Sequence, residues 1–158
     1  MPLTLANHGA QHVASALEAA ALATLEHALA DLPPDQPGLR LPALPSLADM
    51  LSSTGAIGCH AAAHWGAASR PVRAILFDKS AATNWALGWH QDRTIAVRTR
   101  VDTPGFGPWT IKSGIPHVAP PQPLLDRMLT LRVHLDPVDA HNAPLLIAPG
   151  SHRHGRVA

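Results

Sequence analysis

The chain has 158 residues, 46% of them hydrophobic and 15% charged, a balance typical of one folded domain and not of a disordered segment. Twelve Lys and Arg residues against eleven Asp and Glu residues leave a formal charge of +1, so no broad basic field is available for nucleic acid or an anionic membrane. The single cysteine, Cys59, excludes an internal disulfide, and no apolar stretch reaches the roughly 18 residues of a membrane span. These features predict a cytoplasmic protein with neither nucleic acid nor a membrane as its partner.

Residues 1–69 are predicted to form a helical N-terminal part. From about Ala10 to Leu32 apolar residues recur at three-to-four-residue spacing, which indicates an amphipathic helix that covers one side of a sheet. A Pro-rich connection follows. Two short helices are then expected, one from Ser46, as its N-cap, to Leu51 and one from Ala56 to about Trp65, closed by Gly66.

Residues 70–158 are predicted to be mainly β-structure. Strands are expected at residues 72–77, 94–101, 109–112, 128–136 and 144–147, and the last of these leads into a turn at 149–152. A Pro-rich loop is expected over His117–Pro123, and one helical turn over Leu124–Met128. The whole chain is therefore interpreted as a single α+β domain, in which N-terminal helices precede an incomplete jelly-roll core. The five or six strands found are fewer than the roughly eight that close a jelly roll.

The stretch Leu87–Asp92 (Leu-Gly-Trp-His-Gln-Asp) carries the main functional signal. It is predicted to lie on or at the end of a strand, where residues i and i+2 point to the same face. His90 and Asp92 would then project side by side into the space that the sheet encloses. An imidazole nitrogen and a carboxylate oxygen are two members of the two-His-one-carboxylate triad that holds Fe(II). A lone His-x-Asp is also consistent with a hydrogen-bonded pair or a surface turn.

Tryptophan side chains are common near this stretch. Trp85, Trp89 and Trp109 are expected to pack the wall of the sheet and not to stack on a ligand, because large aromatic side chains dominate protein cores.

Several segments, taken in order, resemble the phytanoyl-CoA dioxygenase family over about Arg70 to Gly155. They are Leu76–Lys79, Trp89–Asp92, Met128–Asp136, and Asn142–Leu145 running into Pro149–Arg153. The resemblance implies an Fe(II)- and 2-oxoglutarate-dependent oxygenase, a hydroxylase, on a double-stranded β-helix, which is a cupin-like variant of the jelly roll. Members of the family act on diverse small molecules, so the resemblance does not identify the substrate.

The resemblance also assigns roles to individual residues. It implies that His90 and Asp92 are the first two iron ligands. Lys79 matches a position close to the 2-oxoglutarate pocket, Ile75 would line that pocket, and Arg132 falls near the same co-substrate. His152 is implied to be a turn residue and not a ligand.

Two loop residues beside the proposed mouth of the site, Lys112 and His117, are candidates for contact with the substrate. Their alternative interpretation is that they are solvated loop residues.

Two departures from the family pattern affect the interpretation. Ala143 stands where a glycine is usual, which is expected to stiffen a turn. In the family a distal histidine and a carboxylate-binding arginine lie several tens of residues beyond the Pro-Gly-Ser-His turn, whereas this chain stops at Ala158. We therefore expect a fragment or truncated product that carries two of the three iron ligands, with an open sheet edge that allows self-association.

Three alternatives stay open at this stage. An intact short protein would use a substitute third ligand, which is His134, His152 or His154. A catalytically incomplete fragment or non-catalytic jelly-roll module would keep the barrel wall without the chemistry. A cupin-like metal isomerase or lyase would use His90 with other histidines and would not depend on 2-oxoglutarate.

Overall fold

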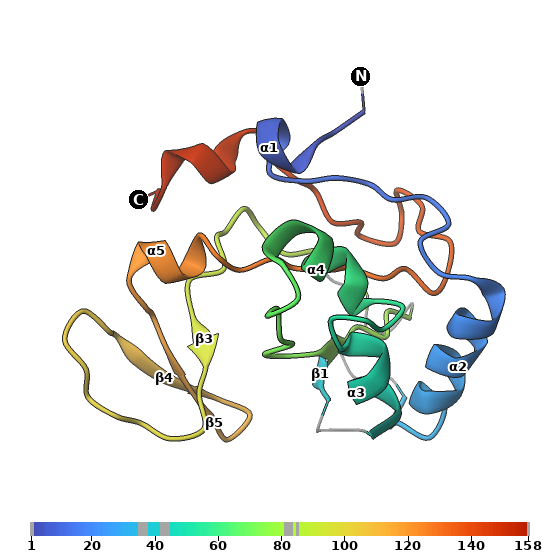
Figure 1. Ribbon diagram of the computed structural model, residues 1–158, viewed down its shortest axis with the longest axis horizontal. Coiled ribbons are helices and arrows are strands. Elements are labelled where there is room, and N and C mark those ends of the chain that lie inside the picture. The colour runs from blue at the N-terminus through green and yellow to red at the C-terminus, as the bar shows by residue number, and fades with distance from the viewer. Residues whose placement is uncertain (1, 35–37, 42–44, 81–83, 85, 158) are drawn as a thin grey trace.

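The computed structural model describes residues 2–34, 38–41, 45–80, 84 and 86–157. Its helices are α1 (Leu5–His8), α2 (Ala19–Leu29), α3 (Pro45–Leu51), α4 (Gly58–Trp65) and α5 (Gln122–Leu125), followed by a 3-10 helix at Ser151–His154. Its strands are β1 (Leu39–Arg40), β2 (Ile75–Leu76), β3 (Ile95–Ala96), β4 (Trp109–Lys112) and β5 (Ile115–Val118). The expected α+β class is confirmed, and Figure 1 shows helices α2, α3 and α4 on one side of the molecule and strands β3, β4 and β5 on the other.

The described strands form two small antiparallel sheets. In the first, β1 pairs with β2 so that Arg40 lies opposite Ile75. In the second, β5 is the central strand between β3 and β4. β4 and β5 are joined by Ser113 and Gly114, whose φ angles are 50° and 75°. A two-residue hairpin loop of this kind requires positive φ at both positions, which glycine adopts without strain.

The hydrophobic core lies in the helical part of the chain. It consists of Leu25 from α2, Leu47 and Met50 from α3, and Ile57 at the start of α4, all less than 9% exposed. The three-stranded sheet contributes one further buried apolar side chain, Val118. The helices therefore stabilise the fold by burying apolar surface, and the sheets contribute little to this core.

The predicted helices correspond to α2, α3, α4 and α5 but differ from them in extent, and α1 was not predicted. Of the helix predicted from about Ala10 to Leu32, only the part in α2 is formed. Ser15 has a φ of 52°, which is incompatible with a right-handed helix and interrupts the predicted segment before α2 begins. Ser46 lies inside α3 and is not its N-cap, because the helix already includes Pro45, a residue that the first helical turn accepts. The closure of α4 by Gly66 is confirmed, since that glycine has a φ of 87° and its N–H donates to the Ala62 carbonyl at 2.7 Å.

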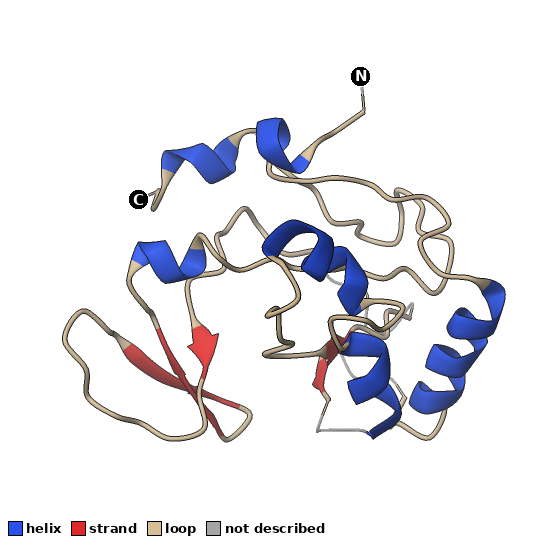
Figure 2. Cartoon of the chain, viewed as in Figure 1, coloured by secondary structure: helices blue, strands red, loops and turns tan. Residues whose placement is uncertain are grey.

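One strand prediction was correct, and the other predicted strands are either much shorter in the structure or not formed. The strand at 109–112 is confirmed as β4, while only two residues of 72–77 and two of 94–101 pair as β2 and β3. Residues 128–136 and 144–147 form no strand, and Figure 2 shows most of the C-terminal third as loop. Leu131 and Leu146 are exposed there, 38% and 68%. Alternating apolar residues form a strand only where a partner strand and a core cover them.

The aromatic predictions are only partly met. Trp89 is 73% exposed, so the expectation that it packs a sheet wall was wrong. Trp109 is half-buried at the start of β4, and Trp85 lies outside the described residues.

Self-association through an open sheet edge stays a prediction. β4 is an edge strand of its sheet, and Ile111 in that strand is 76% exposed. Unpaired edges with apolar side chains favour pairing with a second chain. We expect the apparent mass in size-exclusion chromatography with light scattering to rise with protein concentration, and Ile111→Lys to reduce that rise. A constant monomer mass over the whole concentration range would contradict the prediction.

Candidate functional site

His90 and Asp92 lie in an irregular segment that precedes β3, so the prediction that they sit on a strand was wrong. Gln91, between them, is bound to the C-terminal segment instead of to a sheet: its Nε2 donates to the Gly155 carbonyl at 2.7 Å and its Oε1 accepts from the Val157 N–H at 3.0 Å. His90 and Asp92 are both exposed. They therefore face solvent, and not the enclosed space that the sequence predicts.

The His90 ring has a defined tautomer. Its Nδ1 lies 2.8 Å from the Gly88 carbonyl oxygen, and because a carbonyl only accepts hydrogen bonds, Nδ1 carries the proton. The other nitrogen, Nε2, then presents a lone pair. Histidines that bind metals typically donate their second ring N–H to a backbone carbonyl in this way. In the neutral ring, Nε2 is therefore the nitrogen of His90 that would bind a metal.

Asp92 lines a small hollow of about 140 Å³. Arg73 and Thr94 contribute polar groups to it, and apolar side chains come from the segment 125–129. Lys112 lies close to this hollow, because its Nζ donates to Thr94 Oγ1 at 3.2 Å. Of the proposed substrate contacts, Lys112 is thus near Asp92, although it ends strand β4 and is not in a loop.

The donor types of His90 and Asp92 suit Fe(II), but they supply two ligands only. Within the described part of the chain, no group of three or more His, Cys, Asp or Glu side chains lies close enough to hold a metal ion. His152, expected to be a turn residue, lies in the 3-10 helix, against Gly9 near α1.

Arg132 lies over the Phe77 ring, and its charge also acts on Lys79. The Arg132 guanidinium lies 5.9 Å from the centre of the Phe77 ring, and Lys79 Nζ donates to the Ala143 carbonyl at 2.7 Å. Burial lowers the pKa of Lys79, and the positive charge of Arg132 lowers it further. Ala143 has a φ of 37°, in the left-handed region that glycine prefers. Two residues assigned to the co-substrate by sequence thus form a local concentration of positive charge.

The lowered pKa of Lys79 predicts a pH-dependent stability. Between that pKa and the ordinary value of 10.5, the unfolded chain binds more protons at this residue than the folded chain, so the free energy of unfolding rises with pH. The chain has only two lysines and no tyrosine, so few other groups titrate in this range. We expect Lys79→Met to reduce the rise and Lys112→Met to retain it, as measured by urea denaturation from about pH 7 to 10.5. Equal pH profiles for the wild type and Lys79→Met would refute the prediction.

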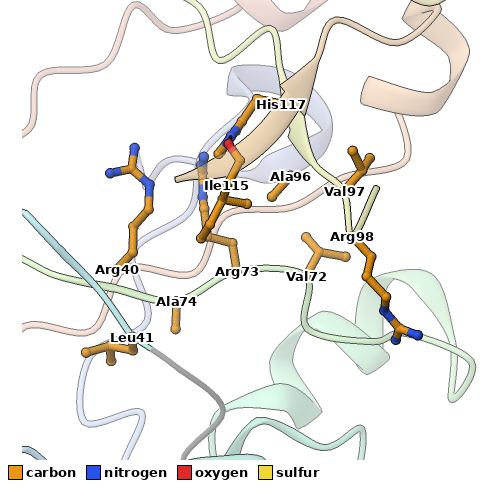
Figure 3. Close-up of a pocket in the computed structure, with 10 residues that line it drawn as sticks. All are labelled: Arg40, Leu41, Val72, Arg73, Ala74, Ala96, Val97, Arg98, Ile115 and His117. Atoms are coloured by element: carbon orange, nitrogen blue, oxygen red, sulfur yellow. Dashed lines mark hydrogen bonds between the residues drawn. The ribbon is translucent and has the colours of Figure 1, made fainter. Parts of the chain in front are cut away.

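The remaining predicted residues lie near the interface of the two sheets. Ile75 is half-buried in β2, opposite Arg40. His117 is fully buried in strand β5, so its assignment to a solvated loop was wrong. β5 is the central strand of its sheet, so its backbone pairs with strands on both sides. His117 lines a cavity with Arg40, Arg73 and Arg98, which is drawn in Figure 3.

Sequence reasoning overlooked these arginines. One signal was present, because Arg73 interrupts the otherwise apolar run at 72–77. An arginine in such a run needs a polar or anionic environment.

Comparisons of the chain with protein-family models, with curated proteins and with solved structures find no match. Among the described helices, none has the length and apolar character required to cross a bilayer. The donor chemistry of the residues above is therefore the basis for a functional assignment.

Proposed function

We propose that this chain carries part of the active site of an Fe(II)- and 2-oxoglutarate-dependent oxygenase of the phytanoyl-CoA dioxygenase type. The observation that carries the proposal is the His90 ring, whose Nδ1–H is held by the Gly88 carbonyl two residues before the exposed carboxylate of Asp92. This combination provides a neutral nitrogen and an anionic oxygen, the donors of the two-His-one-carboxylate triad. The antiparallel pairing of the described strands is the pairing that a jelly roll uses.

The roles of the residues follow from their chemistry. His90 Nε2 and an Asp92 oxygen would hold Fe(II), and a third ligand completes the triad. With O₂ as the oxidant, Fe(II) and 2-oxoglutarate bound there would supply the chemistry that couples decarboxylation of 2-oxoglutarate to succinate and CO₂ with hydroxylation of the substrate. Lys79 and Arg132, whose charges lie close enough to act on each other, would neutralise the carboxylates of 2-oxoglutarate.

The substrate in this proposal is a small molecule of unassigned identity. Lys112, hydrogen-bonded to Thr94 beside the hollow of Asp92, would contact its polar groups. Ile75 would add an apolar surface on the co-substrate side. The chain's contribution is to orient ligands and substrate, while the metal supplies the oxidising chemistry.

A second candidate function is a jelly-roll module without catalytic activity. It is favoured by one observation: the described residues bring no third metal-binding side chain to His90 and Asp92. Two exposed donors bind divalent metals more weakly than a complete triad. Such a module would have no coupling between a metal and 2-oxoglutarate.

Titration of the purified chain with Mn(II), with and without saturating 2-oxoglutarate, separates these two candidates. The oxygenase proposal predicts that 2-oxoglutarate tightens Mn(II) binding by about tenfold or more, because the two ligands share one coordination sphere and their coupling is reciprocal. Succinate formation with Fe(II) and O₂ provides a second readout that a cupin-like isomerase or lyase would not give. Identical Mn(II) affinities in both titrations, together with no succinate above the protein-free control, would reject the oxygenase in favour of the module.

A further inference from the structure

A cavity of about 260 Å³ lies between the two sheets. Residues of β1 and β5 line it, together with the segments 72–74 and 96–98. Three arginines and one histidine contribute to the lining, and none of the described residues around it is acidic. In Figure 3, Arg40 and Arg73 extend towards the side on which His117 lies, whereas Arg98 extends away from them. The cavity is therefore an open, positively charged hollow whose own described lining contains no carboxylate, and Asp92 lies in the neighbouring hollow that shares Arg73.

Two buried nitrogens of this cavity have no hydrogen-bond partner among the described residues. They are Nε of Arg40 and Nε2 of His117, and the His117 side chain is fully buried. A buried polar atom without a partner is costly, and such atoms in native proteins call for an explanation. A ligand that satisfies both nitrogens would remove this cost.

The two nitrogens require opposite partners. His117 Nδ1 lies 2.9 Å from the Ile115 carbonyl oxygen, so Nδ1 is the donor and Nε2 of the neutral ring is an acceptor. Nε of Arg40 is a donor, and the same guanidinium already donates through Nη1 to Ser113 Oγ at 3.0 Å. With the His117 ring neutral, a ligand that matches both nitrogens is an anion that also carries a hydroxyl proton.

The volume of the cavity and the charge of its arginines restrict the class of ligand further. The cavity is smaller than the roughly 300–1,000 Å³ typical of sites for drug-sized ligands, and it is several times the ~30 Å³ occupied by one water molecule. Guanidinium groups pair with the oxygens of phosphates in a bidentate geometry. Inorganic phosphate keeps at least one P–OH group near neutral pH, whereas sulfate and simple carboxylates have no proton to donate.

We propose that this cavity is a binding site for inorganic phosphate. Arg40 and Arg73 bind its charged oxygens, and His117 Nε2 accepts the proton of its P–OH group. The site uses neither His90 nor Asp92, although Arg73 also lines the hollow beside Asp92.

Isothermal titration of the full chain near neutral pH tests the site with inorganic phosphate, sulfate and methyl phosphate. We expect phosphate to bind about tenfold or more tightly than sulfate, the effect of one hydrogen bond to a charged group. Methyl phosphate separates free phosphate from a monoester: its second pKa of about 6 leaves it mostly without a proton near pH 7, so it should bind as weakly as sulfate. Equal affinities for phosphate and sulfate would overturn the proposal, as would tighter binding of 2-oxoglutarate than of phosphate.

Substitutions of the cavity residues test whether phosphate binds at this site. Arg73→Met, at an exposed position, and Arg40→Met should each weaken the binding of phosphate and of sulfate by about tenfold. His117→Phe should lower the phosphate affinity to that of sulfate and leave sulfate unchanged. The control is Arg127→Met, at an exposed arginine outside the cavity, and thermal melting verifies that each variant is folded. Loss of phosphate binding in Arg127→Met, or its retention in the folded Arg73→Met variant, would refute the site.

Discussion

Replacing Leu47 by alanine is expected to lower the free energy of unfolding by about 2–5 kcal/mol. Leu47 is 5% exposed and packs in α3 within the cluster that includes Leu25, Met50 and Ile57. Removing its branched side chain forfeits the transfer free energy and leaves a cavity that its few neighbours cannot fill. Since a domain of this kind is stable by only about 5–15 kcal/mol, the loss is a large part of the total. Urea denaturation followed by circular dichroism measures it.

The matched control is the same substitution at an exposed leucine. Leu146 is 68% exposed in the C-terminal loop, so Leu146→Ala should change the free energy of unfolding by no more than about 0.5 kcal/mol. A comparable loss at both positions would mean that the core is not centred on the helices.

Alanine at His90 or at Asp92 is expected to weaken Mn(II) binding by about tenfold or more. Each substitution removes one of two donors, and even residues that only orient a ligand typically change metal affinity by about 10–100-fold. The double variant should bind no more weakly than the weaker single variant, because one donor alone does not hold the ion.

Controls for these variants use the same residue types elsewhere on the surface. His12 and Asp31 are exposed and lie outside the proposed site, so His12→Ala and Asp31→Ala should leave Mn(II) binding unchanged. A reduction in either control that equals the His90→Ala effect would show that the metal binds non-specifically to surface histidines and carboxylates.

Local sequence chemistry predicted the elements whose geometry is set by a few neighbouring residues. The strand at 109–112 and the closure of α4 by Gly66 are such cases. Elements that depend on a partner strand far away in the chain could not be predicted as well from the local sequence. The alternation at 128–136 satisfies the pattern of a strand, yet none of the described strands pairs with it. Residues 117–118 of β5 were interpreted as the start of a Pro-rich loop, although β5 pairs on both edges.

The candidate sites show the same division. The spacing of His90 and Asp92 is readable in the sequence, and so is the nearness of Lys79 and Arg132 once a family resemblance is invoked. The burial of His117 and its convergence with Arg40 could not be predicted, because these residues are far apart in the chain and meet only where two sheets approach each other. Their chemistry depends on a tautomer that is fixed by the backbone carbonyl of Ile115.

The central claim is that His90 and Asp92 bind a divalent metal together, and paramagnetic NMR tests it most directly. The chain has eleven histidines, whose ring protons report the position of substoichiometric Mn(II) by line broadening. We predict that the His90 signals broaden first and that this selectivity disappears in Asp92→Ala. Broadening that begins at another histidine, or that is uniform over all of them, would contradict the claim.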